Sequence, residues 1–295
     1  MSFNICCSNP HKIKYQLNGT SSDLIAAQLA YLLWNLPEVD SYQAMHGSVF
    51  SNSVYDEYLF NLFMLEADLC EEDIRFVADN SIINRSEAEF FLEEICVNCQ
   101  KIIFINPKNK GCTKIIALFK NLRDCIAHGC FGMVEEYFIG FNHPRFEGKE
   151  YTAVFKLKYE HLYQAIETIT SGDVLFLIYK EALEKNGYTI IEREDKKEAD
   201  LIASKGDAIF FLDFKKYRGR YLNQTDIQRY INETRDKSNR NGLNVLVVDS
   251  TYTNSKINKY IMGENIGIVD KKYVKELLEG RDILMEIAEK IQNNY

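Results

Sequence analysis

The sequence predicts a two-domain protein, with an all-α helical bundle carrying a small β-hairpin in residues 1–170 and an α/β domain with a central mixed sheet in residues 171–295. Three observations lead to this prediction. The chain has 295 residues, which is enough for two hydrophobic cores. Long segments with apolar residues at helical spacing dominate the first half. In the second half, short apolar runs alternate with amphipathic segments.

Composition limits the classes of protein that need to be considered. Apolar residues make up 46% of the chain and charged residues 26%, which is typical of a globular protein. We find no signal-peptide pattern and no apolar run long enough to cross a bilayer, so we expect a cytoplasmic protein without membrane contacts. The net charge of −8 excludes a generally basic nucleic-acid coat. A local basic cluster, KKYRGR at 215–220, is either a phosphate-binding patch or a solvated turn.

The cysteines are expected to be reduced thiols rather than metal ligands. The chain has eight, and most lie in apolar helical contexts. Cys96 and Cys99 have C-x-x-C spacing, and Cys6, Cys7 and His11 form a loose cluster near the N-terminus. A zinc site requires a second pair of ligands at suitable spacing, and none follows Cys99. The sequence therefore favours structural thiols over zinc at either place.

The first half is expected to be mainly helical. Apolar residues at helical spacing predict four long helices, over residues 21–36, 54–69, 85–104 and 113–128. Ser86 and Glu89 form a capping-box pattern at the start of the third helix, and Gly129 follows the end of the fourth. A β-hairpin with a long loop and a last helix are expected next, over residues 135–141, 151–158 and 160–169.

The stretch NLRDCIAHG, at 121–129, places ionisable side chains at the end of the fourth helix. Asp124 and His128 are four residues apart and share a face, where the carboxylate can fix the tautomer of the imidazole and raise its basicity. Arg123 and His128 lie roughly 140° apart around the helix axis, so a site that uses both needs a cleft beside the helix end. The alternative is an ordinary helix end closed by a glycine.

This stretch resembles the signature of the HEPN family of helical nucleases, an arginine and a polar residue followed by a histidine near a helix end. The resemblance covers about residues 20–170. It implies an obligate dimer and RNA cleavage without a metal, in which the ribose 2′-OH attacks the adjacent phosphate. Arg123, Asp124 and His128 would form the site, with His128 moving protons and Arg123 stabilising charge on the phosphate. The alternative is a HEPN-like bundle that only dimerises.

The second half is expected to alternate between helices and strands. A helix over 173–187 comes first, and the strands that follow are expected over 188–193, 198–204 and 208–217. A helix capped at Asn223 or Thr225 comes next, then an apolar central strand, a short strand and a C-terminal helix, over 223–240, 243–250, 266–269 and 271–292. The core order is α-β-β-β-α-β.

Carboxylates converge at the end of the third strand of this half. Residues 209–212 are apolar on both faces, and Asp213 and Lys215 then follow two apart, on the same face. Ionisable groups at the end of a buried strand are costly unless they are paired or bound to a metal. Asp200 on the preceding strand is close enough to meet Asp213. Two carboxylates favour a divalent cation with oxygen ligands, Mg²⁺ above all, and Lys215 could position or deprotonate a bound water.

The segment ADLIASKGDAIFFLDFK, within a region of about residues 174–270, resembles the PD-(D/E)xK nuclease superfamily, which has the restriction-endonuclease-like fold. Two departures are Ala199 in place of the usual proline and Asp213 in place of the usual glutamate. The resemblance implies phosphodiester hydrolysis with Mg²⁺ or Mn²⁺ held by Asp200, Asp213 and the Phe214 carbonyl, and with Lys215 assisting the nucleophile. The alternative is an aspartate–lysine ion pair in a degenerate domain.

The same resemblance implies supporting residues around this site. A glutamate of the first core helix often joins such sites, which indicates Glu184, or Glu181. A glutamine of the following helix is also common, which indicates Gln228, or Gln224. The basic cluster follows the strand directly, so its side chains are expected to bind nucleic acid at the mouth of the site, through Lys216, Arg218 and Arg220.

Two nucleolytic resemblances in one chain suggest a nuclease of anti-phage defence or of toxin type, by family analogy. The hypothesis includes a nucleic-acid substrate, RNA or DNA, a homodimer, and an antitoxin or defence-system partner. One alternative is a single-site Mg²⁺-dependent DNA endonuclease whose HEPN-like half only dimerises or senses. The other is a non-catalytic interaction protein in which both sites are relics.

Overall fold

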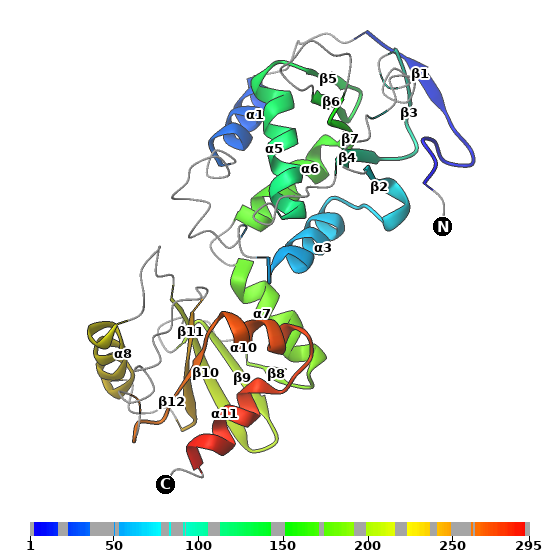
Figure 1. Cartoon of the computed structure of the whole chain (residues 1–295). Helices are drawn as coiled ribbons and strands as arrows, with labels where there is room; N and C mark the ends of the chain where they lie inside the picture. The colour runs from blue at the N-terminus through cyan, green and yellow to red at the C-terminus, as the bar shows by residue number, and fades with distance from the viewer. Residues whose placement is uncertain are drawn as a thin grey trace. The chain divides into compact units, whose positions relative to one another are not determined.

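The chain divides into two compact units, Met1–Ser171 and Gly172–Tyr295. The computed structural model (Figure 1) describes residues 3–16, 23–35, 50, 53–77, 83, 91, 93–105, 113–142, 151–170, 174–191, 199–215, 223–236, 241–248, 261 and 263–292. Within these residues no helix is both long enough and apolar enough to cross a membrane.

The first unit is built around a five-stranded mixed sheet with the strand order β2-β4-β7-β6-β5. In sheet order these strands are Ile74–Val77, Lys101–Ile105, Ala153–Lys158, Tyr137–Asn142 and Phe131–Val134. β2 is parallel to β4, and the other neighbours are antiparallel. β1 (Lys12–Lys14) and β3 (Glu94–Cys96) form a separate antiparallel ribbon.

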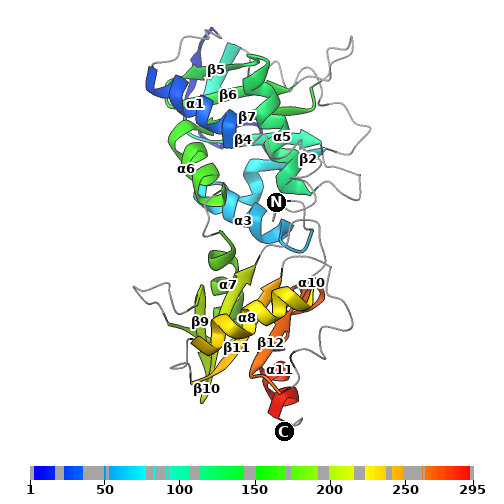
Figure 2. The same ribbon diagram turned by 90° about the vertical axis from the view of Figure 1, so that its left-hand side faces the viewer.

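Helices cover one face of this sheet (Figure 2). They are α1, α3, α5 and α6, over Asp23–Asn35, Asp56–Glu66, Lys114–Ala127 and Tyr159–Thr170. A short 3-10 helix, Glu71–Asp73, leads into β2. α5 begins after Thr113, whose hydroxyl accepts a hydrogen bond from the Ile116 N–H over 3.3 Å. These elements confirm four of the predicted helices and the predicted hairpin of β6 and β7.

The prediction of an all-α bundle with one small hairpin is wrong for this unit. Part of the error lies in the helix expected over 85–104, because the described residues of this range include β3, a turn and most of β4. Residues 102–104 are fully buried, since β4 lies inside a sheet that is covered on both faces. A short run that is apolar on both faces fits a buried strand as well as a buried helix. The capping-box residues Ser86 and Glu89 lie outside the described residues.

The ribbon and the N-terminal segment cover the other face of the sheet. Ile103, Ile139 and Val154 point to this side, and they pack in one buried cluster with Ile95 of the ribbon. Phe3 of the N-terminal segment packs against the same cluster. The first unit is therefore a three-layer structure, with helices, sheet and ribbon in that order.

Two buried lysines lie on this ribbon-covered face. Lys101 of β4 and Lys156 of β7 are directly opposed in the sheet. Lys101 forms an ion pair with Asp73, with 2.6 Å between nitrogen and oxygen. Lys156 is fully buried and donates to the Cys96 carbonyl over 2.6 Å and to the Cys99 Sγ over 3.2 Å. Because a buried ammonium needs acceptors, polar contacts help to fix the ribbon on the sheet.

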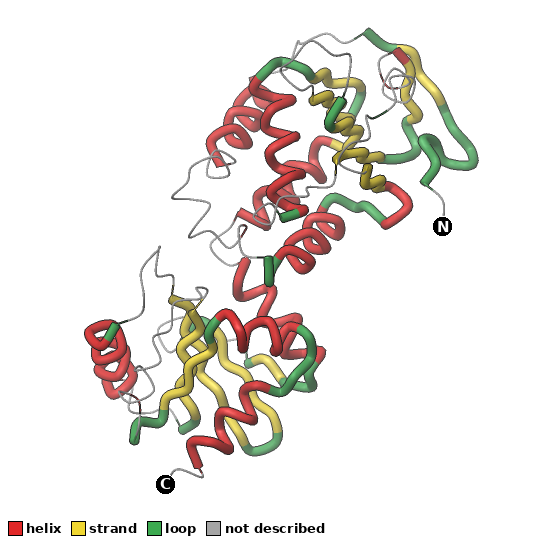
Figure 3. The backbone as a smooth tube through the Cα atoms, in the orientation of Figure 1, coloured by secondary structure: helices red, strands yellow, loops and turns green. Residues whose placement is uncertain are grey.

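The second unit also has a five-stranded mixed sheet, with the order β12-β11-β10-β9-β8 (Figure 3). In sheet order the strands are Ile266–Val269, Leu243–Val248, Ala208–Lys215, Leu201–Lys205 and Thr189–Ile190. β8, β9 and β10 are antiparallel neighbours, and β11 and β12 continue parallel to β10. Helix α8 covers one face, and α7, α10 and α11 cover the other. These helices are Gln224–Asp236, Val174–Lys185, Lys271–Leu278 and Ile283–Gln292.

The element order of this unit confirms the predicted α-β-β-β-α-β core with a central mixed sheet. The predicted cap at Asn223 is also confirmed. The Asn223 side chain accepts from the Asp226 N–H, and the Asn223 N–H donates to the Asp226 carboxylate, both over 3.1 Å. The single C-terminal helix expected over 271–292 is two helices, because the chain turns at Gly280, where φ is 96°.

β12 and α11 approach each other closely at Gly267. A Cβ atom at this position would lie 2.6 Å from Cγ2 of Ile287 in α11, well inside van der Waals contact. The missing side chain at residue 267 therefore sets how closely α11 packs on the sheet.

The substitution Gly267→Ala should lower the free energy of unfolding by about 1–3 kcal/mol, because the added methyl overlaps Ile287. Urea denaturation of the full chain measures this loss. Ile287→Ala removes the overlapping methyl and supplies the matched background. The cost of Gly267→Ala should be smaller in that background than in the wild-type chain, and equal costs would contradict the packing argument.

Candidate active site

The end of β10 presents alternating side chains to the two faces of the sheet. Asp213 and Lys215 point toward α8, where both make contacts. Phe214 between them points toward α7, where its ring centroid is 4.9 Å from that of Tyr179. This alternation follows from the pleat of a strand, so Asp213 and Lys215 share a face, as their spacing predicts.

Asp213 is a buried carboxylate, with 7% of its surface exposed. Its Oδ2 accepts a hydrogen bond from the Tyr230 hydroxyl of α8 over 2.8 Å. Burial of a carboxylate is costly without such donors. The contact therefore both satisfies Asp213 and ties α8 to the central strand.

Asp200 lies where β9 and β10 separate. The last pair of the ladder joins Leu201 and Leu212. Beyond this pair β9 no longer pairs with β10, and the Asp200 carboxylate accepts the hydrogen bond from the Phe214 N–H over 2.6 Å. The N–H and C=O of one strand residue point toward the same neighbour, so the Phe214 carbonyl faces this side too. Asp200 is exposed, and among the described residues its Oδ1 has no protein partner.

Lys215 is the last residue of β10. Its Nζ lies 3.5 Å from Glu233 Oε2 of α8, and the two side chains are 43% and 44% exposed. An exposed ion pair of this kind contributes little to stability. The ammonium can therefore leave Glu233 for a phosphate or a water bound at the end of the strand.

Tyr230 and Glu233 are site residues that the sequence analysis did not single out. They lie three apart in α8, on one face of the helix, and contact Asp213 and Lys215 respectively. Polar residues three apart, on a helix that directly follows the candidate strand, are the sequence feature that could have identified them.

The structure does not bring the predicted glutamine to this site. Gln228 is exposed and donates to Asn232 of the same helix over 3.3 Å. Gln224, the other residue considered, is also exposed, at the first position of α8. The polar contacts from α8 come instead from Tyr230, two residues after Gln228 and on a different side of the helix.

The predicted glutamate of the first core helix is also separate from Asp213. Glu184 lies near the end of α7 and is exposed. α7 covers the face to which Phe214 points, whereas Asp213 points to the opposite face. Glu181, the other residue considered, forms an ion pair with Lys185.

Apart from Lys215, the basic cluster at the end of the strand lies outside the described residues. Its predicted nucleic-acid-binding side chains are Lys216, Arg218 and Arg220.

The donors at the end of β10 fit a hard divalent cation. They are the Asp200 carboxylate, the Asp213 carboxylate and the Phe214 carbonyl, all oxygens, which Mg²⁺ and Mn²⁺ prefer. Within the described part of the chain, no third acidic side chain joins both carboxylates in a group with donor atoms within 4.8 Å of one another. A cation held here would therefore keep several water ligands, as Mg²⁺ does.

The other predicted site lies in the first unit, at the end of α5. His128 is the C-cap residue, with an exposed side chain and an N–H that donates to the Asp124 carbonyl. Gly129 follows at a φ of 65°, the left-handed conformation typical after a helix. Arg123 Nη1 lies 3.9 Å from Asp124 Oδ1. Among the described residues, the His128 imidazole contacts neither side chain, and α5 packs on a sheet rather than in the expected helical bundle.

Comparison with known proteins does not assign a family to this chain. No family model matches it. No curated protein matches it either. A crystal structure of a repair endonuclease from Pyrococcus abyssi aligns with 46% of this chain, at 17% identity and a TM-score of 0.23. The alignment spans 62% of that endonuclease, and a superposition at this TM-score assigns neither fold nor activity.

Tyr230→Phe should lower the free energy of unfolding by about 1–3 kcal/mol, because it removes a donor to the buried Asp213 carboxylate. Urea denaturation followed by circular dichroism measures the change. The control is Tyr159→Phe, which removes a buried hydroxyl that has no hydrogen-bond partner among the described residues. That control should leave stability nearly unchanged, and equal losses in the two variants would contradict a specific role for the Tyr230–Asp213 contact.

Proposed function

We propose that the second unit hydrolyses phosphodiester bonds of a nucleic acid with the help of a divalent cation. The observation that carries the proposal is the arrangement at the end of β10. There the Asp200 carboxylate binds the Phe214 peptide N–H at 2.6 Å, beside the buried Asp213 and on the strand that ends in Lys215. This arrangement collects oxygen donors and one ammonium at a strand end that solvent can reach.

Each residue has a distinct role in the proposed reaction. Asp200, Asp213 and the Phe214 carbonyl would hold Mg²⁺ or Mn²⁺, which when bound lowers the pKa of a water and stabilises charge on the phosphate. The Tyr230 hydroxyl keeps the Asp213 carboxylate in one orientation. The Lys215 ammonium would orient the attacking water, or hold a phosphate oxygen once it leaves Glu233.

One observation favours a second, non-catalytic function. Asp213 binds Tyr230 and Lys215 pairs with Glu233, so both predicted catalytic side chains also attach α8 to the sheet. In this alternative Asp213 and Lys215 have a structural role, and the unit is an interaction module. The two functions differ in what a neutral side chain at residue 213 does, because asparagine retains an acceptor for Tyr230 but loses the charge that a cation requires.

The narrower parts of the hypothesis rest on resemblance alone. A role in anti-phage defence or as a toxin, a homodimer, and an antitoxin or defence-system partner stay predictions. So does metal-independent RNA cleavage at Arg123, Asp124 and His128, which lacks the helical bundle that the resemblance implies.

Purified full-length protein should cut labelled DNA or RNA with Mg²⁺ or Mn²⁺, and lose this activity in EDTA. Lys215→Ala should reduce the cleavage rate by about 10²–10⁴-fold, because it removes the group that assists the nucleophile. Asp213→Asn should abolish cleavage with little loss of stability, and it should abolish the Mg²⁺-dependent rise in melting temperature. Lys272→Ala, at an exposed lysine of α10, is the matched control.

Full activity of the folded Asp213→Asn variant would refute the proposal, because cleavage would then not require the charge of Asp213. RNA cleavage that survives EDTA and disappears in His128→Ala would instead assign an activity to the end of α5. No cleavage of any substrate by the wild-type chain, together with no Mg²⁺ effect on melting, would leave the structural role of Asp213 as the explanation of its position.

A further inference from the structure

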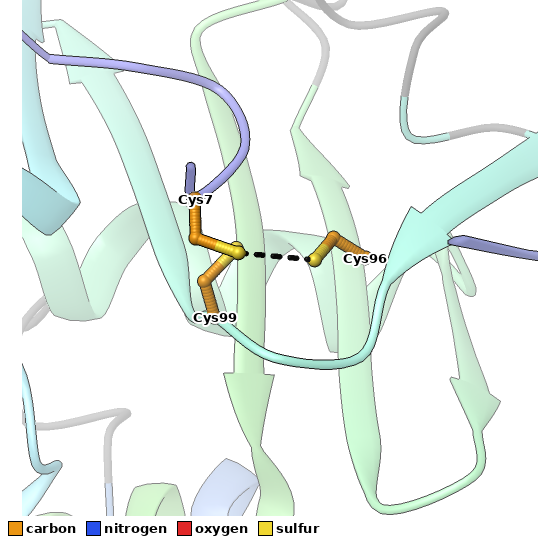
Figure 4. Close-up of side chains that lie close together, drawn as sticks. All are labelled: Cys7, Cys96 and Cys99. Atoms are coloured by element: carbon orange, nitrogen blue, oxygen red, sulfur yellow. Dashed lines mark hydrogen bonds between the residues drawn. The ribbon is translucent and has the colours of Figure 1, made fainter. Parts of the chain in front are cut away.

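Cysteines that are distant in the sequence meet beside the sheet of the first unit (Figure 4). β1 pairs with β3 in a register that sets Lys12 opposite Cys96. This pairing carries the N-terminal segment, with Cys6 and Cys7, to the C-x-x-C turn between Cys96 and Cys99. The sulfur atoms of Cys7, Cys96 and Cys99 all lie within 4.8 Å of one another. No second ligand pair follows Cys99, but Cys7 precedes Cys96 by 89 residues and meets it in the fold.

We propose that Cys7, Cys96 and Cys99 bind one zinc ion. Zinc–sulfur bonds of about 2.3 Å in a tetrahedral site place the sulfurs about 3.8 Å apart. The Cys7 and Cys96 sulfurs are 3.7 Å apart. A disulfide would bring them to about 2 Å. The separation therefore fits two thiolates on one ion.

The C-x-x-C turn presents Cys96 as a metal ligand requires. The Asn98 N–H donates to Cys96 Sγ over 3.5 Å, a contact that stabilises the charge of a thiolate. The Asn98 side chain donates to the Asn9 carbonyl over 2.9 Å and so ties the N-terminal segment to the turn.

The buried ammonium of Lys156 supports the proposal independently. Lys156 is fully buried, and its Nζ lies 3.2 Å from Cys99 Sγ. Among the described residues no carboxylate pairs with it; its other contacts are the Cys96 carbonyl and the Tyr137 ring. A buried ammonium without a counter-charge is costly. Three thiolates carry more negative charge than the Zn²⁺ ion carries positive charge. The centre therefore has a net negative charge, which can balance the ammonium of Lys156.

Cys6 is the nearest candidate for a fourth ligand, although its sulfur lies outside the group of three within 4.8 Å of one another. A pocket of about 480 Å³ lies beside the cluster and is lined by Cys6 as well as Cys7 and Cys99. With Cys6 as the fourth thiolate the site would be closed, the type that zinc occupies for structure rather than for catalysis. The ion would clamp the N-terminal segment to the sheet.

Metal analysis of the full chain, purified in reductant without added metal, tests the proposal. We expect about one zinc per chain. Cys96→Ser and Cys99→Ser should each lose the ion, and Cys6→Ser should bind it more weakly. Cys70→Ser is the matched control, because Cys70 is exposed and lies outside the cluster. Its thiol donates to Asp73 Oδ2, and a serine hydroxyl can donate the same hydrogen bond. Co²⁺ should replace zinc and give the intense visible absorption of tetrahedral thiolate ligation, which carboxylate ligands do not give.

A serine variant that misfolds would also lose zinc, so the wild-type chain supplies a second readout. Chelation should expose the thiols of Cys7, Cys96 and Cys99 to a thiol reagent, and zinc should protect them again. Wild-type protein that contains no zinc and gives no thiolate absorption with Co²⁺ would overturn the proposal. Zinc retained by both Cys96→Ser and Cys99→Ser would do the same. Unchanged affinity in Cys6→Ser would remove Cys6 from the ligand set.

Discussion

The ammonium of Lys156 is the constraint on which the first unit depends. It lies between the sheet and the ribbon, fully buried, and the described acceptors within reach are the Cys96 carbonyl and the Cys99 sulfur. Cys96 ends β3 and Cys99 lies just after it, so satisfying this one charge requires the end of β3 to sit on β7. β3 in turn pairs with β1, and β1 holds the N-terminal segment over the apolar face of the sheet. One buried charge thus links the covering layer to the core.

A different constraint organises the second unit. β10 is flanked on both sides by other strands and covered on both faces, so polar side chains are tolerated best where it separates from β9 while it still pairs with β11. The ladder to β9 stops at Leu212, and within three residues the strand changes from apolar to ionisable. The position of Asp213 and Lys215 at this end explains why ionisable side chains can be accommodated there. Whether they also perform chemistry depends on what else gathers there, and Asp200 is the residue that joins them through the Phe214 peptide.

The sequence predicted local features well and non-local ones unevenly. Helix α5 and the core order of the second unit follow from periodicity and turn residues, which act over a few positions. The five-stranded sheet of the first unit did not follow. The apolar run of β4 has no period that separates strand from helix, and β2 becomes a strand by pairing with β4 rather than through its own pattern. The contacts of Tyr230 and the meeting of Cys7 with Cys96 depend on tertiary packing, which no local pattern encodes.

Two proposed metal sites of different chemistry affect how metal dependence is interpreted in this chain. Thiolates bind Zn²⁺ strongly, whereas two carboxylates and a carbonyl suit Mg²⁺, which keeps much of its water. A chelator such as EDTA can remove both ions, so loss of cleavage in EDTA does not by itself assign the metal to Asp200 and Asp213. Recovery of cleavage with Mg²⁺ alone points to the oxygen ligands at the end of β10. A requirement for Zn²⁺ as well would point to a contribution from the cysteine site of the first unit, unless Zn²⁺ acts at the carboxylates.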